Sequence, residues 1–444
     1  MKVGLIEVKP LEGGYVAKEM AGGLGKRIKL DKGYIGKVLE TRLSAMFSAP
    51  PMLLAQIAGI CTSFGHEVRA YHTRSVEDVD ERTNLAIILG TMVDYQNEIK
   101  FASELHDSFP DLSVVFLGSF PTAMPDMFMA GGNHVIKGDP ETAVHNILEN
   151  GLPDEKIVES PRPINLNVLP VPDWEPFIAN SYFARRPFSS ERGICIQKSR
   201  GCSMSCNYCP YAGIYGKANH YDSDYVIDLI KRYRDEHNIR YFMFRDPNFG
   251  ENRRQFREFM EKLLDLDLDI TWSCEARLDT FKSDDDLKLM AQAGLRYIIT
   301  GIEASDEDLL RKNLRRPIPK EDAVRKLNLL ESDGVIVQTN YILGFPEEHE
   351  ESVYETIEYA KSINSMFATF HVFTPQPGTK IFDQYSDKLL NLDWEEYNYS
   401  NLVWDHDTLS KTFLETITAN TYSSYYFRYD WFKKHAVKLT KLLL

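Results

Sequence analysis

The chain has 444 residues, of which 43% are hydrophobic and 26% charged, values of an ordinary globular protein that is long enough for two or three domains. Its formal net charge of −14 argues against a nucleic-acid partner, which requires a strongly basic face. The first residues, MKVGLIEVKPLEGG, lack the features of a signal peptide, and no apolar run approaches the ~20 residues of a membrane-spanning helix. We therefore expect a cytoplasmic protein, in which clustered cysteines are metal ligands rather than disulfides.

The first third of the chain alternates short apolar strands with helices. Helices are expected over 50–65, over 94–109 and from Pro140, and the expected strands are MKVGLIEV, HEVRAYHT, NLAIILGT, LSVVFLGS and HVIKG. Buried strands that alternate with helices predict a doubly wound parallel sheet, here a Rossmann-like domain over 1–158. Such sheets bind ligands at the carboxyl ends of their strands, which fall at 90–95, 118–125 and 137–141.

A Pro-rich stretch over 159–185 is expected to be a linker, and the alternation resumes after it. Helices are expected over 223–236, 252–265, 283–293, 305–332 and 350–363. The strands between them are ICIQKSR, IRYFMFRD, DITWSCEA, RYIITGIEA, VIVQTNYILG and FATFHVFTP. This pattern predicts a partial (β/α)6 barrel over 186–380, whose active site lies at the carboxyl ends of the strands. Acidic, aromatic loops and a final helix over 381–444 are expected to cap the substrate.

Three of the six cysteines follow the first expected barrel strand with the spacing C-x3-C-x2-C, at Cys202, Cys206 and Cys209. A four-iron cluster held by three thiolates keeps one iron open for a small molecule. The alternative is a structural metal site with a remote fourth ligand. Three unrelated core thiols are not expected within eight residues. The candidates for the remote ligand are Cys195, Cys274 and His220.

The segment CSMSCNYC resembles the signature of the radical SAM superfamily, and the resemblance extends over the expected barrel. It includes RDPNF, WSCEARLD, AGLRYIITGIEAS, YILGFPEE and PQPGT. The front part resembles the cobalamin-binding domain of one branch of that superfamily, through PPMLLAQIAG, FGHEV, TMVDY, VVFLGSFPTAMP, KGDPET and LPVPDW. Over residues 3–380 the chain therefore resembles the radical SAM enzymes that carry a B12-binding domain.

The resemblance implies that the three cysteines hold a [4Fe–4S] cluster that chelates S-adenosylmethionine (SAM). An external one-electron reductant of the flavodoxin or ferredoxin type would drive cleavage of SAM to a 5′-deoxyadenosyl radical. Each residue that the resemblance places near SAM also has a structural explanation, as a core aromatic, a turn or helix cap, a buried carboxylate or a strand-ending turn. These residues are Tyr208, Asp246, Asn248, Glu303, Gly344 and Phe345.

The resemblance also implies cobalamin at the carboxyl edge of the front sheet. The front domain lacks the D-x-H-x-x-G motif that supplies an axial histidine in many cobalamin proteins, as this branch usually does. Its turns LGSFP and KGDPE differ from the family pattern, and Phe120 is bulky where a small turn would meet the corrin. A domain that no longer binds cobalamin is the alternative. The cobalamin contacts implied are Met92, Val93, Asp94, Gly118, Ser119 and Gly138.

The reaction that the resemblance implies is methylation of an unactivated carbon of a small molecule, with one S-adenosylhomocysteine and one 5′-deoxyadenosine formed per product. An alternative is a dehydratase or cyclase without methyl transfer, with Glu275, Tyr215 or His371 as the general base. A third is a non-catalytic cobalamin or SAM sensor. The last residues, 425–444, predict a helix that covers the barrel mouth or associates weakly with a membrane surface.

Overall fold

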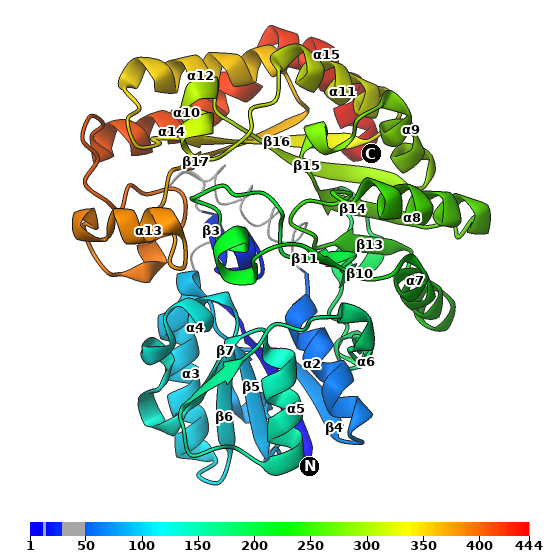
Figure 1. Cartoon of the computed structure of the whole chain (residues 1–444), viewed down its shortest axis with the longest axis vertical. Helices are drawn as coiled ribbons and strands as arrows, with labels where there is room; N and C mark the ends of the chain where they lie inside the picture. The colour runs from blue at the N-terminus through cyan, green and yellow to red at the C-terminus, as the bar shows by residue number, and fades with distance from the viewer. Residues whose placement is uncertain (12–14, 29–48, 444) are drawn as a thin grey trace.

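The computed structural model describes residues 1–11, 15–28 and 49–443. Its front sheet has six parallel strands in the order β4-β1-β5-β6-β7-β8, shown in the lower part of Figure 1. All five residues of β5, LAIIL, are buried, as expected for a strand covered on both faces. The strands are β1 (Lys2–Val8), β4 (Glu67–Thr73), β5 (Leu85–Leu89), β6 (Ser113–Leu117), β7 (His134–Gly138) and β8 (Ile157–Ser160). The helices are α2 (Met52–Ser63), α3 (Tyr95–Ser108), α4 (Ser119–Ala123) and α5 (Pro140–Asn150).

The second sheet, which we call the barrel sheet, has seven strands in the order β17-β16-β15-β14-β13-β10-β9. All its neighbouring pairs are parallel except β9–β10, and β17 and β9 remain edges, so the barrel is open. The predicted α/β fold, with a front sheet and a partial barrel, is confirmed. The strands are β9 (Ala184–Arg185), β10 (Arg192–Ile196), β13 (Tyr241–Phe244), β14 (Thr271–Glu275), β15 (Leu295–Glu303), β16 (Ile336–Leu343) and β17 (Phe367–Val372).

Helices follow the barrel strands and are bounded by local sequence signals. Ser283 and Asp286 form a capping box at the start of α9, and Asn252 caps α8 through its side chain. Asn238 and Asn364 end α7 and α12 in the left-handed conformation, which asparagine tolerates. The helices are α7 (Ser223–His237), α8 (Arg253–Leu266), α9 (Asp284–Gln292), α10 (Glu307–Lys312), α11 (Lys320–Ser332) and α12 (Glu350–Ile363), with short α6 (Glu175–Ala179) before the barrel.

The single helix predicted over 305–332 is wrong, because the structure has two helices there, α10 and α11. Pro317 and Pro319 lie between them, and a proline disrupts a continuous helix because it lacks the backbone N–H. The break allows Arg315 to turn back onto the end of β15, where its Nη2 donates a hydrogen bond to the carbonyl oxygen of Gly301 at 2.6 Å.

The C-terminal region also differs from its prediction. It has a short α13 (Lys380–Gln384) and two longer helices, α14 (Lys411–Tyr426) and α15 (Tyr429–Leu443). Trp431 Nε1 of α15 donates to the carbonyl oxygen of Met366 at 3.2 Å, just before β17 begins. The last helix therefore covers the amino ends of the strands, not the barrel mouth as predicted. Among the described residues, no helix is long and apolar enough to cross a membrane.

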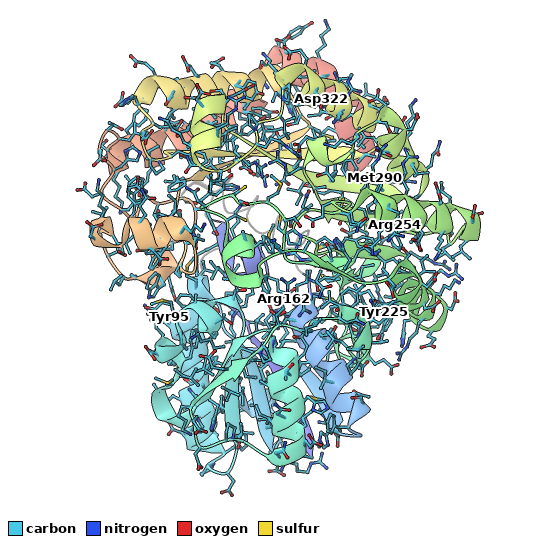
Figure 2. The ribbon with its side chains drawn as sticks, in the orientation of Figure 1. Tyr95, Arg162, Tyr225, Arg254, Met290 and Asp322 are labelled. Carbon is cyan, nitrogen blue, oxygen red and sulfur yellow. The ribbon has the colours of Figure 1, made fainter. Side chains whose placement is uncertain are left out.

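A small antiparallel hairpin lies between the two sheets, where no regular element was expected. It consists of β2 (Tyr15–Ala17) and β3 (Lys26–Ile28), and Figure 1 shows β3 near the centre of the molecule. Residues 15–28, which we call the hairpin segment, contact both domains. Arg162 also lies at this junction (Figure 2), where its Nη2 donates to the carbonyl oxygen of Arg200 at 2.8 Å.

Candidate active site

The three cysteines lie on a loop at the carboxyl end of β10. Two short strands, β11 (Ser199–Arg200) and β12 (Asn219–His220), pair at the base of this loop. The backbone N–H of Cys202 donates to Gly216, and that of Cys209 donates to Cys206, at 3.0 and 3.2 Å. Cys206 is buried and the other two cysteines are half-buried. The loop is therefore held by backbone hydrogen bonds while all three thiols are available as ligands.

The three thiols are spaced more widely than the sulfur ligands of a preformed tetrahedral zinc site. A tetrahedral zinc site with Zn–S bonds of ~2.3 Å brings its sulfurs to about 3.8 Å from one another. In the part of the chain that the structure describes, the three Sγ atoms do not all lie within 4.8 Å of one another. Burial raises the pKa of Cys202 to about 11 and that of Cys209 to about 12, so ligation of metal must release protons.

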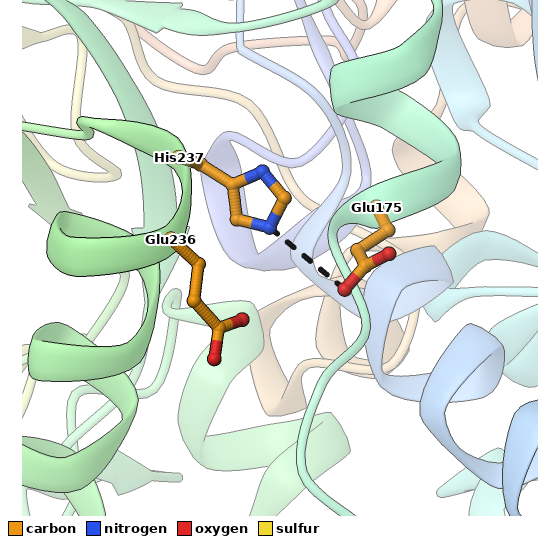
Figure 3. Close-up of side chains that lie close together, drawn as sticks. All are labelled: Glu175, Glu236 and His237. Carbon is orange, nitrogen blue, oxygen red and sulfur yellow. Dashed lines mark ion pairs between the residues drawn. The ribbon is translucent and has the colours of Figure 1, made fainter.

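A different group of side chains, Glu175, Glu236 and His237, does have ligand atoms within 4.8 Å (Figure 3). Both carboxylates already share an ion-pair partner, because Arg232 contacts Glu175 at 3.1 Å and Glu236 at 3.3 Å. The two glutamate side chains are also more than half exposed. We therefore explain this group as a surface ion-pair cluster.

Tyr208 lies between two of the cysteines, with its ring edge against Phe345 at a centroid distance of 5.3 Å. Its Oη is buried and has no hydrogen-bond partner among the described residues. A buried polar atom without a partner costs about 1–3 kcal/mol, so such atoms mark places where a ligand completes the site. The position of Tyr208 therefore fits its predicted contact with SAM.

Glu303 ends β15 in a left-handed conformation, with φ of 75°. Its Oε1 lies 3.0 Å from Nη2 of Arg315, a residue that the sequence analysis missed. Burial raises the pKa of Glu303, while the positive charge of Arg315 opposes this rise. The guanidinium of Arg315 also interacts with Cys206. One cation therefore connects Glu303, which is predicted to lie near SAM, with the cysteine loop. Pro317 and Pro319, which interrupt the helix pattern just after Arg315, were the sequence signal that could have indicated that Arg315 turns back toward the barrel.

The other residues predicted near SAM have partners within the protein. Asp246 accepts hydrogen bonds from the backbone N–H of Lys198 at 3.0 Å and from Ser199 Oγ at 2.6 Å. Asn248 Oδ1 accepts from the backbone N–H of Arg277. The N–H groups of Gly344 and Phe345 both donate to the carboxylate of Glu348, at 2.7 and 2.8 Å. These four residues hold the strand ends in place, and their direct contact with SAM stays a prediction.

Two of the three predicted general bases lie near one another, and the third lies elsewhere. Glu275, on β14, accepts a hydrogen bond from Arg245 Nη1 at 3.2 Å. His371, on β17, lies 3.1 Å from the Nζ of Lys26, and Glu275 acts electrostatically on the same lysine. Tyr215 instead contacts Ser119 at the domain junction, with 2.7 Å between their hydroxyl oxygens.

A cavity of about 420 Å³ lies between the inner face of the barrel sheet and the carboxyl ends of β1 and β4. Its size is that of a small-molecule site, for which roughly 300–1,000 Å³ is typical. Arg245 and Glu275 line this cavity, and so do Cys195 and Cys274, two of the candidates for the remote fourth ligand of a structural metal site. Both cysteines are buried on barrel strands, Cys195 on β10 and Cys274 on β14, and neither belongs to the cysteine loop.

The residues predicted to contact cobalamin lie at the carboxyl edge of the front sheet, but the hairpin segment covers several of them. Met92, Val93 and Asp94 are at most 1% exposed. The backbone N–H of Met92 donates to Leu24, and Arg27 Nη2 donates to the carbonyl oxygen of Val93, at 2.8 and 2.7 Å. These three residues, which are predicted to contact the corrin, are therefore covered by the chain's own hairpin segment.

Two ion pairs and three glycines hold the hairpin segment over these residues. Lys18 lies 2.9 Å from Asp94 and 2.5 Å from Glu98, and all three side chains are at most 2% exposed. Gly22, Gly23 and Gly25 all have positive φ, and a Cβ at Gly25 would come within 2.7 Å of Val93. The sequence GGLG thus allows the hairpin segment to approach the sheet edge closely.

The other three predicted cobalamin contacts line what remains of the junction. Gly118, Ser119 and Gly138 border a cavity of about 70 Å³, in which Ser119 Oγ donates to the carbonyl oxygen of Gly22 at 2.5 Å. The adjacent turn forms ion pairs with the barrel domain, because Asp139 and Glu141 both contact Arg200, at 3.3 and 2.6 Å. In the described chain this cavity is smaller than the roughly 300–1,000 Å³ of a typical small-molecule site.

Residues 196–360 match the family model of the Radical SAM superfamily. Sequence relatives include an anaerobic magnesium-protoporphyrin IX monomethyl ester cyclase of Rubrivivax gelatinosus, 26% identical over 58% of this chain and 47% of the relative. An uncharacterized methyltransferase of Pyrococcus horikoshii is also 26% identical, over 61% of this chain and 59% of the relative. The chain thus spans about half the length of the curated relatives it matches.

Solved structures with the same fold include TsrM of Kitasatospora setae, a radical SAM methyltransferase with cobalamin and a [4Fe–4S] cluster bound. It is 14% identical, with a TM-score of 0.63 over 87% of this chain and 78% of that chain. The cobalamin-dependent enzyme OxsB is 13% identical, with a TM-score of 0.61 over 82% of this chain and 52% of that chain.

The fold and site define an α/β protein with an open parallel barrel and a three-cysteine loop at its mouth. The family match identifies residues 196–360 as a radical SAM domain, which implies a [4Fe–4S] cluster and SAM as cofactors. The overall fold is the one shared by TsrM and OxsB, both of which bind cobalamin. The predicted resemblance to the radical SAM superfamily is confirmed over residues 196–360.

Proposed function

We propose that the protein is a radical SAM enzyme that removes a hydrogen atom from a small molecule held inside the barrel. When bound by Cys202, Cys206 and Cys209, a [4Fe–4S] cluster supplies the electron that cleaves SAM to methionine and a 5′-deoxyadenosyl radical. The single observation that carries the proposal is a loop within the matched domain that presents three thiols beside the orphaned hydroxyl of Tyr208. We also propose that an external one-electron reductant reduces the cluster and that the protein is located in the cytoplasm.

The residues of the chain then have separate tasks. Tyr208, Phe345 and Phe373 form an aromatic wall beside the cysteine loop, which would hold the adenosyl group and exclude water. Arg315 compensates the charge of Glu303 until the ribose hydroxyls bind there. Arg245 and Glu275 border the cavity in which the substrate would lie. Such positioning and shielding is the contribution of a protein to cofactor chemistry.

For the fate of the substrate radical, we propose rearrangement, elimination or ring formation without methyl transfer. Several relatives carry names of methyltransferases, and others are cyclases, so the relatives alone support either outcome. Methyl transfer from cobalamin, the reaction predicted from the sequence, requires a corrin beside the substrate. The hairpin segment over Met92–Asp94 and the small junction cavity favour the reaction without it.

The test is product analysis of the anaerobically reconstituted full chain, with dithionite or flavodoxin as the reductant. We expect 5′-deoxyadenosine to form from SAM, with no S-adenosylhomocysteine beyond that of a reductant-free control. Equal amounts of the two products would contradict the reaction without methyl transfer. Absence of 5′-deoxyadenosine from a protein with its full complement of iron would contradict the proposed function itself.

A further inference from the structure

Lys26 is carried into the barrel by the hairpin segment, although the sequence analysis gave it no role. It is the first residue of β3, and its neighbours Leu24 and Arg27 are both bonded to the front domain. Successive side chains of a strand point to opposite faces. Because Arg27 reaches Val93 of the front sheet, Lys26 points the other way, and its Nζ lies 3.1 Å from His371 Nε2 on β17.

The surroundings of Lys26 contain little negative charge for its ammonium group. Glu275 raises the pKa of Lys26, but its Oε1 is already bonded to Arg245. Burial outweighs this effect and lowers the pKa of Lys26 to about 8. His371 faces the lysine as a neutral ring, because burial and the charge of Lys26 push the pKa of this histidine well below its usual value. Tyr399, whose ring lies 6.1 Å from that of His371, keeps its hydroxyl neutral because burial raises its pKa.

The hydrogen-bond capacity of Lys26 is also largely unused. An ammonium group has three donors, and in the described part of the chain Nζ has one side-chain partner, the His371 ring. The nearby cation Arg245 is instead paired with a carboxylate, since it donates to Glu275 as well as to the carbonyl oxygen of Glu19. Among the described residues Lys26 faces a neutral ring, and its ammonium group has donors left for a ligand.

We propose that Lys26 binds an anionic oxygen of the substrate, a carboxylate or a phosphate, and orients the carbon that loses its hydrogen atom. This inference rests on the proposed function and deepens it, because it names the substrate class. Lys26 and His371 do not line the cavity themselves, but Glu275, which acts electrostatically on Lys26, does. A bare ammonium group is a point charge that suits either anion. His371 holds the lysine in place as a neutral acceptor, and the anchored strand β3 fixes its height in the barrel.

The first experiment uses the reconstituted full chain and a small-molecule extract of the source cells, separated by ion exchange into anionic and neutral fractions. We expect the anionic fraction to stimulate formation of 5′-deoxyadenosine by the wild type. Lys26→Met should lower this stimulation about tenfold or more, since a hydrogen bond to a charged group contributes ~1.5–3 kcal/mol, and Lys26→Arg should restore part of it. Lys100→Met, on an exposed helix face, is the matched control and should respond like the wild type.

Stimulation by the neutral fraction alone, or an equal response of wild type and Lys26→Met to the anionic fraction, would overturn the inference while the proposed function stands. Absence of 5′-deoxyadenosine under all conditions would instead contradict the proposed function.

A second measurement is independent of turnover. Acetylation of Lys26 by an amine-reactive reagent is followed by peptide mass spectrometry with sodium phosphate, with sodium acetate or with sodium chloride at equal ionic strength. Protection by phosphate or by acetate supports the inference and distinguishes the two anions. Equal acetylation in all three salts, with Lys100 as the internal reference, would overturn it.

Discussion

The two carboxyl edges of this protein face each other across the hairpin segment, and they differ in how their polar groups are satisfied. At the front edge, Lys18 pairs with both Asp94 and Glu98, and Met92 is bonded to Leu24. At the barrel edge, within the described residues, Tyr208 Oη has no hydrogen-bond partner and Lys26 Nζ has one side-chain partner. Both sheets are parallel and have the same potential for ligand binding. The two edges therefore differ in the pairing of their lysines. Among the described residues each edge holds a buried polar atom without a hydrogen-bond partner, Arg27 Nε at the front edge and Tyr208 Oη at the barrel edge.

The largest effect is expected at the barrel edge. Replacing Cys202, Cys206 and Cys209 together by alanine removes every protein ligand of the cluster loop, so bound iron and SAM cleavage should fall to background. Iron analysis and 5′-deoxyadenosine formation measure this loss. Cys61→Ala, a buried thiol of α2, is the matched control and should retain both. Full iron content in the triple variant would show that the cluster lies elsewhere.

The next effect concerns the front edge. Lys18→Met leaves Glu98 buried without its cation, while Asp94 keeps Arg27 at 3.6 Å, and loss of one partner of a buried pair costs ~3–5 kcal/mol. Urea unfolding of the full chain measures this free energy. Lys100→Met removes a lysine from an exposed pair and should change it by less than about 1 kcal/mol. Equal stability of the two variants would mean that the hairpin segment is not locked onto the front sheet.

A smaller effect is expected from Glu348, whose carboxylate fixes the turn that carries Phe345. Burial raises its pKa to about 7 from 4.5. In the unfolded chain this group ionises near 4.5, so its contribution to stability is complete below that pH and is lost as the pH rises toward 7. Glu348→Gln should therefore flatten the decline in unfolding free energy between about pH 5 and about pH 7, measured by urea unfolding. An unchanged decline in the variant would contradict this assignment.

The smallest effect is expected from Tyr208→Phe. Since its hydroxyl has no partner in the described chain, its removal should leave stability unchanged or slightly improved. SAM affinity should fall about fivefold, the loss of roughly one hydrogen bond, in equilibrium dialysis with the reconstituted protein. Destabilisation by more than about 1 kcal/mol without any change in SAM affinity would assign Tyr208 to the core instead.

Much of the molecule was predictable because its signals are local. Apolar runs such as LAIIL indicate buried strands, and the spacing of Cys202, Cys206 and Cys209 indicates an open cluster site. The contacts of Lys18 and Lys26 were not predictable, because they join residues that are far apart in the sequence and leave no periodic pattern. Phe120 lies between these cases. The sequence showed a bulky side chain where a small turn would meet the corrin, but it did not show what this side chain contacts. In the structure Phe120 packs against Trp394, with 5.6 Å between the ring centroids.

We propose that the barrel carries out its radical chemistry beside a front-sheet edge that the chain's own hairpin segment covers over Met92–Asp94. It is tested most directly by anaerobic reconstitution with iron, sulfide and hydroxocobalamin, followed by gel filtration and visible spectroscopy of the full chain. The account predicts a protein that retains its iron–sulfur absorption and cleaves SAM but carries no stoichiometric corrin. One corrin retained per chain would contradict it, and would restore methyl transfer as the expected reaction.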